Sequence, residues 1–444
     1  MANNNALNRE REAYTKKHAK SKTMQAEAAK YLPGGSSRGT AYFDPYPFFV
    51  DHAEGHYVYD VDGNRYLDFM INATTYIVGH ANPKVVKAVT DQAPKGLSYS
   101  APTDVQVRLA KLLVERVPSV EKIRFTNSGT EGTMNAIRMA RAFTGKPKYA
   151  KFEGGYHGNS EEVSISVSPP LSKLDPNGYN PVPEWPGQPP GVTNDVVIMP
   201  YNNLEACEDI LRRHQHEVGC VIMEAVLSNI GYVPGKPEFL QGMRDLTKEL
   251  GMVLIFDEVQ TLRLAPGGAQ EMFGVIPDVT CFGKIIGGGL PVGAWGGRDD
   301  LMALYDNQKG ATISHPGTFN ANPMTMAAGE ATMTQLTPPV YKRLNALGDS
   351  LRAKLRATFD ELDVPAQVTG VGSLFGIHFN EHEITDYRSY LKGDKAKLNA
   401  FYVGMMNEGI LMFAKGIGAL NINTTEKEID QFVTAARKVV QRIR

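Results

Sequence analysis

Short apolar runs alternate with helical patterns through the middle of the chain, and this alternation constrains the fold more than any other feature. The segments between the runs, such as 132–143 and 237–250, carry helical periodicity. Alternation of this kind predicts a mostly parallel sheet covered by helices, and therefore an α/β fold. The expected strands are 122–125, 149–152, 220–223 and 252–256.

The two ends of the chain have a different texture. The first 31 residues predict a polar, mostly helical arm, and 48–50 and 57–59 predict short strands of an antiparallel meander. After Pro338 we expect a long helix, strand-like segments at 368–379 and 409–423, and a closing helix from Glu426. The expected domains are an arm and meander at 1–75 that contributes to the small domain and the active site, a large α/β domain at 76–335, and a small α+β domain at 336–444.

A stretch rich in proline and glycine, 168–191, interrupts the alternation and contains Trp185. Loops of this length inside a compact domain are usually functional or disordered. The sequence therefore leaves two interpretations of this stretch: a lid beside the active site or a disordered segment.

Composition narrows the function. Lys plus Arg is 47 and Asp plus Glu is 48, so the charge balance gives no support for a nucleic-acid surface. No apolar run is long enough for a membrane span, and the first 23 residues lack the apolar centre of a secretory signal, so we expect a cytoplasmic protein without a membrane partner. The three cysteines lack CxxC spacing and predict packing in a reducing compartment, and we expect no metal site.

The strongest local signal is the pair Asp257 and Lys284. Asp257 ends the run 252–256, and ligands of open α/β sheets gather at the carboxyl ends of the strands. Lys284 is a lone cation among apolar residues and glycines. Desolvation there would favour the neutral amine, which can form an imine with a carbonyl group. The alternative is a surface lysine beside a glycine turn.

Three further features suit a phosphorylated pyridine cofactor. The segment 127–131 follows a strand and opens a helical pattern, which could offer backbone N–H groups to a phosphate or could be an ordinary helix cap. Tyr156 follows another strand and could stack on a ring. Asp257 could keep a ring nitrogen protonated, while the adjacent Glu258 should point the other way.

Together these residues resemble the class III aminotransferase family of pyridoxal-phosphate (PLP) enzymes of fold type I. The resemblance runs from Pro33 to the C-terminal helix, and its motifs are 127–131 (NSGTE), 156–158 (YHG), 257–259 (DEV), 283–289 (GKIIGGG) and 317–319 (GTF). It implies pyridoxal 5'-phosphate as cofactor, a large PLP-binding domain with a mostly parallel sheet, and a smaller α+β domain. A non-enzymatic binding protein derived from this family would be expected to lose Lys284 or Asp257. Both residues are present, which argues against that alternative. A nicotinamide enzyme would need a GxGxxG or P-loop pattern in context, and neither occurs.

The resemblance also implies roles for single residues. Lys284 would carry the cofactor as a Schiff base and then move the substrate proton. Asp257 would pair with the ring nitrogen. Thr318 would reach the phosphate of a neighbouring subunit, which implies a homodimer with shared active sites. The cofactor residues implied in this way are Ser128, Gly129, Thr130, Tyr156, Asn229, Asp257, Val259, Lys284 and Thr318. The chain has Glu224-Ala225 where the family more often has Glu-Pro, which affects the surroundings of Asn229.

Two branches of the family compete for the substrate. The segment 283–294 resembles glutamate-1-semialdehyde aminomutase, whereas 33–38 (PGGSSR) and 263–266 (RLAP) resemble β-amino-acid (β-phenylalanine) aminotransferases. The position of Arg38 favours the second branch, with a β-amino acid as amino donor and a keto acid as acceptor. Arg38 would bind a substrate carboxylate, and Lys415 stands where that branch tends to have an acceptor-binding arginine. Two alternatives to this function remain: the aminomutase reaction, and another fold-type I reaction such as amino-acid racemisation.

Overall fold

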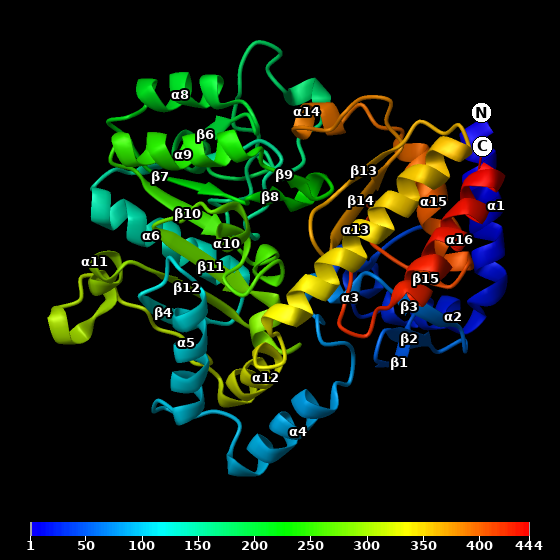
Figure 1. Ribbon diagram of the computed structural model, residues 1–444, viewed down its shortest axis with the longest axis horizontal. Coiled ribbons are helices and arrows are strands. Elements are labelled where there is room, and N and C mark those ends of the chain that lie inside the picture. The colour runs from blue at the N-terminus through cyan, green and yellow to red at the C-terminus, as the bar shows by residue number, and fades with distance from the viewer. Residues whose placement is uncertain (1, 444) are drawn as a thin grey trace. The chain divides into compact units, whose positions relative to one another are not determined.

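The computed structural model describes residues 2–443, which form two compact units (Figure 1). Unit 1 contains the described residues up to Asn82, Arg343–Glu383 and those from Lys392 onward. Unit 2 contains Pro83–Lys342 and the short segment Ile384–Leu391. Among the described residues, no helix has the length and apolar character that a membrane span requires.

A seven-stranded sheet forms the centre of unit 2, with the strand order β4-β12-β11-β10-β7-β5-β6. Strand β12 runs antiparallel to both of its neighbours, and every other pair is parallel. The mostly parallel sheet confirms the predicted α/β class. The strands are β4 (Lys122–Thr126), β5 (Lys148–Phe152), β6 (Val196–Met199), β7 (Val218–Met223), β10 (Val253–Asp257), β11 (Val279–Gly283) and β12 (Gly293–Gly297).

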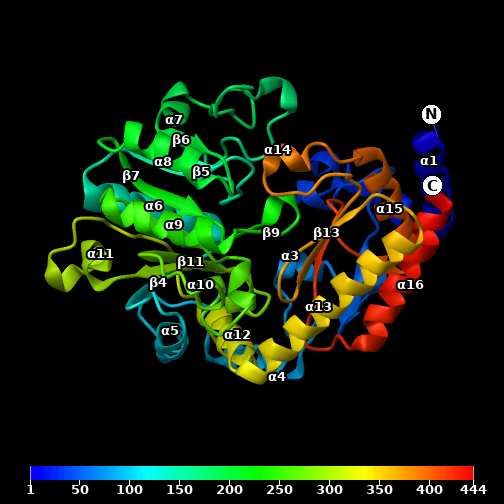
Figure 2. The ribbon, with the colours of Figure 1, turned by 45° about the horizontal axis from the view of Figure 1, so that its top comes forward.

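Helices pack against this sheet because each buries one apolar face on it. Helix α6 contacts six of the seven strands and buries Ile137, Met139 and Ala140, with Trp295 of β12 in the same core cluster. Figure 2 shows α6 and α9 alongside the strands. The helices of unit 2 are α4 (Pro83–Gln92), α5 (Asp104–Arg116), α6 (Gly129–Thr144), α7 (Pro190–Asn194), α8 (Leu204–Arg213), α9 (Pro237–Glu249), α10 (Ala269–Phe273), α11 (Asp299–Met302), α12 (Pro323–Met333) and α14 (Tyr387–Tyr390). Strands β8 (Val226–Leu227) and β9 (Val233–Pro234) form a separate two-stranded antiparallel ribbon.

Unit 1 has two small sheets, ordered β1-β2-β3-β15 and β13-β14-β16. Their strands are β1 (Val50–Glu54), β2 (Tyr57–Asp60), β3 (Arg65–Asp68), β13 (Gln367–Thr369), β14 (Leu374–His378), β15 (Ile410–Leu411) and β16 (Ile417–Ala419). Its helices are α1 (Ala2–Lys17), α2 (Ala19–Ala28), α3 (Ile71–Thr74), α15 (Lys395–Asn407), α16 (Glu426–Ile443) and most of α13 (Pro338–Glu361). The helical arm, the long helix after Pro338 and the closing helix from Glu426 are confirmed.

Some local expectations needed correction. The first strand of the meander begins at Val50 rather than at Phe48, because its pairing with β2 begins at Val50 and Asp60, the last residue of β2. Three strands of the large sheet, β6, β11 and the glycine-rich β12, were not among those predicted. The three cysteines are buried and unpaired, in agreement with a packing role.

One lysine lies wholly inside unit 2. Lys151 of β5 has no exposed surface, and its Nζ donates to the carbonyl oxygens of Gly155 (2.9 Å) and Ile165 (2.5 Å). Burial lowers the pKa of Lys151 from 10.5 to about 7, although the nearby carboxylates of Glu184, Glu224 and Glu153 oppose the shift. Lys151 therefore fixes two loop carbonyls at the carboxyl end of β5.

This pKa gives the stability of the protein a testable pH dependence. Between pH 7 and 10.5 the folded chain binds fewer protons at Lys151 than the unfolded chain, so the free energy of unfolding should rise with pH and fall again as the pH returns to 7. The slope is about 1.4 kcal/mol per pH unit. Replacing Lys151 by Met should remove this contribution to the slope. The difference in the free energy of unfolding between wild type and variant, measured in urea, should therefore change by about 2 kcal/mol between pH 7.5 and 9. Lys148→Met is the control, because Lys148 lies on the same strand but pairs with Glu217 nearer the solvent. Equal slopes in all three proteins would contradict the prediction.

Candidate active site

The carboxyl ends of neighbouring strands bring Asp257 and Lys284 to one edge of the large sheet. Asp257 is the last residue of β10, and Lys284 directly follows β11, which is parallel to β10 with Asp257 opposite Cys281. Lys284 has a φ of +50°, a left-handed conformation that is uncommon outside glycine. Backbone strain of this kind concentrates at functional sites.

The surroundings of Lys284 favour its neutral form. Desolvation by the surrounding protein lowers the pKa of Lys284, and the carboxylates of Asp257 and Glu224 oppose the shift. A lysine with a lowered pKa has a larger share of the unprotonated amine, which is the nucleophile that forms an imine. The site therefore suits Lys284 to bond to a carbonyl group.

The carboxylate of Asp257 is held from two sides. Oδ1 accepts from the backbone N–H of Val259 at 3.0 Å, and Oδ2 lies 3.0 Å from Nδ1 of the buried His157. Burial lowers the pKa of His157, so a neutral ring that donates through Nδ1 fits this contact. Nε2 of His157 has no partner among the described residues. The sequence reasoning assigned His157 no role, although it follows Tyr156 directly in the motif 156–158.

Helix α6 provides a cradle for an anion at the same edge. Ser128 is its N-cap and accepts from the backbone N–H of Glu131 at 3.2 Å, while the carboxylate of Glu131 accepts from the N–H of Asn127 at 2.6 Å. The first hydrogen bond of the helix runs from Gly132 to Ser128, so the N–H groups of Gly129 and Thr130 precede it. A Cβ on Gly129 would lie 3.1 Å from Val259 Cγ2, which places Val259 against this first turn.

Tyr156 lies on a turn that follows β5 and is 43% exposed. Its backbone N–H donates to Oε1 of Glu224 at 3.2 Å, and Oε2 of Glu224 accepts from the N–H of Ser228 at the same distance. Burial and the charge of Asp257 raise the pKa of Glu224 to about 8. Asn229 donates through Nδ2 to the carbonyl oxygens of Gly154 (3.1 Å) and Val167 (2.8 Å). The sequence analysis assigned Glu224 no role, although it follows the predicted strand 220–223 as Asp257 follows 252–256, and this position is the signal that could have found it.

Glu258 points away from Asp257, as strand alternation predicts. Its carboxylate accepts from Thr261 Oγ1 at 2.6 Å and from the backbone N–H groups of Ala269 (2.8 Å) and Gln270 (2.9 Å) at the start of α10. Glu258 is therefore committed to that helix, whereas the carboxylates that act on Lys284 are those of Asp257 and Glu224.

The remaining predicted residues lie elsewhere in the chain. Thr318 is exposed in unit 2, on a segment that Asn127 contacts through Asn320 at 3.1 Å. Arg38 and Lys415 are exposed residues of unit 1. Nη1 of Arg38 donates to Oδ1 of Asn72 at 2.6 Å. The nine residues predicted for the cofactor all belong to unit 2.

These groups meet the requirements of a phosphorylated pyridine aldehyde. The first turn of α6 offers N–H donors to the phosphate, Asp257 offers a fixed carboxylate, and Lys284 offers an amine with a lowered pKa. The model of one aminotransferase family, "Aminotransferase class-III", matches residues 40–438. The chain belongs to the class-III aminotransferases.

Named relatives of this aminotransferase cover almost its whole length. It is 38% identical to the glutamate-1-semialdehyde 2,1-aminomutase of Thermodesulfovibrio yellowstonii, over 96% of this chain and 100% of the relative. Among solved structures, an omega-transaminase from Sphaerobacter thermophilus is 39% identical, with a TM-score of 0.91 over 95% of this chain and 97% of the other. A beta-phenylalanine aminotransferase from Variovorax paradoxus is 34% identical, with a TM-score of 0.90 over 99% and 97%.

The predicted family, fold type and cofactor are thereby confirmed. This aminotransferase is a PLP-dependent enzyme of fold type I, and its similar solved structures include a transaminase with PLP bound. When bound, the cofactor supplies an electron sink for the carbon that carries the amino group. The residues that would hold this cofactor are Lys284 through its amine, Asp257 through its carboxylate, and the first turn of α6 through its N–H groups.

The position of the covalent bond can be tested directly. Borohydride should fix the cofactor on the peptide that contains Lys284, because this lysine has a lowered pKa beside Asp257. Lys284→Ala should retain weak cofactor binding through the α6 cradle and lose turnover. Peptide mapping by mass spectrometry is the measurement, and Lys151 is an internal control, because it is buried but its amine is bonded to two carbonyls. A label on Lys151 or any other lysine would show that the site is wrongly assigned.

Proposed function

We propose that this aminotransferase moves an amino group from a β-amino acid to a keto acid. The observation that carries the proposal is Arg38, which follows Gly35 after only two serines in the segment 33–38. Its guanidinium donates through Nη1 to Asn72, and a substrate carboxylate would take another edge of the planar group. Lys415 is the proposed contact for the carboxylate of the acceptor.

The residues of unit 2 have separate roles in this reaction. Lys284 moves the proton at the substrate carbon, because its amine is the base beside Asp257. Asp257 keeps the ring nitrogen protonated, and His157 and the Val259 N–H hold its carboxylate in place. Tyr156 and Val259 are proposed to cover the two faces of the ring. Ser128, Gly129 and Thr130 are proposed to hold the phosphate, and Asn229 the ring hydroxyl.

The second candidate is a glutamate-1-semialdehyde 2,1-aminomutase. The curated relative from Thermodesulfovibrio yellowstonii supports this activity directly. The relatives favour this candidate in overall identity, since the chain is 38% identical to that aminomutase and 34% identical to the beta-phenylalanine aminotransferase, so the β-amino-acid proposal depends on Arg38. The two reactions differ in one respect that can be measured, because an aminomutase rearranges its substrate without a keto-acid acceptor.

We also propose that the active unit is a cytoplasmic homodimer with shared sites. Several apolar side chains of unit 2 are exposed, and a second copy could cover them. They are Val86 (50%), Leu97 (60%), Tyr99 (44%), Val107 (61%) and Phe319 (58%). Thr318 lines a hollow of about 590 Å³ together with Ser98–Pro102 and Gln106, so it is accessible to a neighbouring chain. Three unpaired thiols support a reducing compartment.

The substrate is tested by changing Arg38 and the acceptor. Loss of a guanidinium–carboxylate pair in Arg38→Ala should lower kcat/KM for β-phenylalanine about 30- to 1000-fold. Arg38→Lys should recover only part of this loss, because an ammonium group lacks the bidentate fork. Arg65→Ala is the control, since Arg65 lies over the ring of Tyr57 and has no proposed role. Rapid conversion of glutamate-1-semialdehyde to 5-aminolevulinate without acceptor, with no transfer from β-phenylalanine, would replace this proposal by the aminomutase.

The shared site is tested with two inactive variants. Lys284→Ala removes the amine, and Thr318→Trp should block the phosphate site of the partner. A mixed dimer would have one site with both changes and one with neither, so random reassembly should restore about one quarter of the wild-type sites. Activity after mixing and refolding is the measurement, and each variant refolded alone is the control. A fully active monomer in sedimentation would contradict the proposal.

A further inference from the structure

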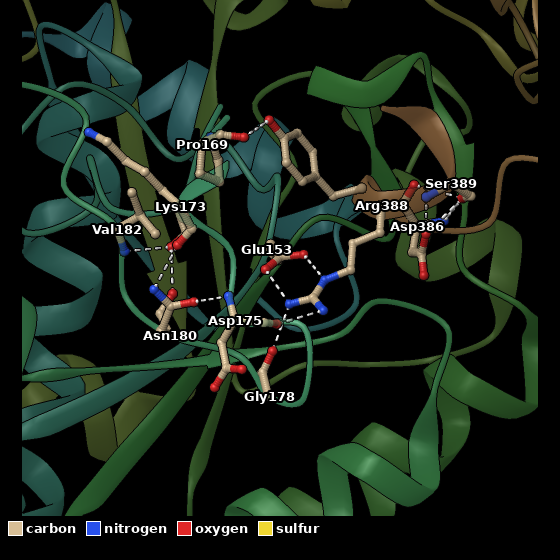
Figure 3. Close-up of polar contacts among 12 residues, drawn as sticks. Glu153, Pro169, Lys173, Asp175, Gly178, Asn180, Val182, Asp386, Arg388 and Ser389 are labelled. Atoms are coloured by element: carbon tan, nitrogen blue, oxygen red, sulfur yellow. Dashed lines mark hydrogen bonds and ion pairs between the residues drawn. The ribbon is translucent and has the colours of Figure 1, made fainter. Parts of the chain in front are cut away.

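The segment that contains α14 belongs to unit 2, whereas the chain on both sides of it belongs to unit 1. Its fold is locally fixed, because Asp386 caps α14 and forms a reciprocal capping box with Ser389. Asn202 of unit 2 donates through Nδ2 to the carbonyl of Thr385 at 2.9 Å. Figure 3 shows this segment beside the proline-rich loop and the end of β5.

Arg388 of α14 joins two parts of unit 2. Nε and Nη2 donate to the two carboxylate oxygens of Glu153 at 2.9 and 3.1 Å, and Glu153 is 2% exposed (Figure 3). The same guanidinium donates to the carbonyl oxygens of Asp175 (3.0 Å) and Gly178 (2.6 Å) in the proline-rich loop. It also lies over the ring of Tyr179, 4.4 Å from the centroid.

The neighbouring Tyr387 contacts the same two parts. Its hydroxyl donates to the carbonyl of Pro169 at 2.8 Å, at the start of the loop. Its ring covers Gly154, where a Cβ would lie 2.7 Å from Tyr387 Cδ2, and the φ of Gly154 is +83°. Gly154 opens the turn that carries Tyr156 and His157, so α14 packs directly against that turn.

Hydrogen bonds within the loop connect the positions that Arg388 contacts, so loss of Arg388 should affect the loop as a whole. Asn180 accepts from the backbone N–H of Asp175 at 2.8 Å and donates to the carbonyl of Lys173 at 3.1 Å. Ser166, which precedes the loop, donates to the carbonyl of Asn180 at 3.2 Å. Arg388 contacts the loop at Asp175 and Gly178, between these bonds, and loss of its guanidinium would remove two carbonyl contacts at once.

We propose that Arg388 is a positioning residue that ties the loop 169–182 to the turn 153–157 and thereby fixes the ring of Tyr156 beside the cofactor. The geometry exceeds that of a surface ion pair, because the carboxylate of Glu153 is buried and receives both donors of the guanidinium fork. The first part, the tie between loop and turn, stands on the contacts alone. The second part rests on the proposed role of Tyr156.

The experiment compares wild-type holoenzyme with Arg388→Met, Arg388→Lys and Glu153→Gln. Arg212→Met is the matched control, because Arg212 is an arginine of unit 2 that pairs with Glu208 and Glu249 at the surface. Trypsin cleavage after Lys173, an exposed residue of the loop, measures how often the loop opens. Circular dichroism of the bound cofactor in the visible range, with the rate of cofactor dissociation, measures how Tyr156 is held.

Arg388→Met should be cleaved at Lys173 at least about tenfold faster than wild type, the change expected when a hydrogen bond to a charged group is lost. Its visible dichroism should change and its cofactor should dissociate faster. Arg388→Lys should fall between the two, Glu153→Gln should resemble Arg388→Met, and Arg212→Met should resemble wild type.

Cleavage and dichroism like those of Arg212→Met would overturn the proposal. Faster cleavage with unchanged dichroism and cofactor dissociation would overturn the positioning of Tyr156. A wild-type protein that takes up no PLP would instead refute the proposed function, and the cleavage rates would still decide the tie between loop and turn.

Discussion

The carboxylate of Asp257 is the fixed point on which the site depends. It is buried, and a buried carboxylate that loses its hydration needs hydrogen-bond donors. The donors are the N–H of Val259, whose side chain lies against the first turn of α6, and Nδ1 of His157, which follows Tyr156. The bonds that satisfy Asp257 therefore also hold the first turn of α6 and the turn that carries Tyr156 in register with Lys284.

Buried ionisable side chains surround the turn that carries Tyr156, and each is hydrogen-bonded to the backbone or to a partner. Lys151 holds the carbonyl of Gly155, Glu224 accepts the N–H of Tyr156, and Glu153 receives Arg388. Burial of these groups costs solvation free energy, and such networks define a single arrangement when every member is satisfied. The turn lies at the end of β5 without regular structure of its own, so these charges supply the restraint that a strand or helix would otherwise give.

Much of the fold could be predicted because burial on both faces of a parallel sheet produces continuous apolar runs. The run that ends at Phe256 became β10, and the helical pattern after Gly132 became α6. Strand β12 could not be predicted in this way, because Gly-Ala-Trp-Gly-Gly lacks the β-branched residues typical of strands. It is a strand because it pairs with β4 and β11, and Trp295 fills the core beside α6.

The sequence by itself determined the family, the cofactor and the residues of the candidate site. Asp257, Lys284 and the segment 127–131 each carry a local signal, since a residue after a buried strand or at a helix start has a defined place. The tertiary structure alone decided which residues support them. His157, Glu224 and Arg388 lie 100, 33 and 131 residues from Asp257 along the chain, and side chains separated in this way meet only when the sheet and its connections have formed. His157 and Glu224 each follow a strand, but nothing local in the sequence shows that His157 pairs with Asp257 or that Glu224 accepts the N–H of Tyr156.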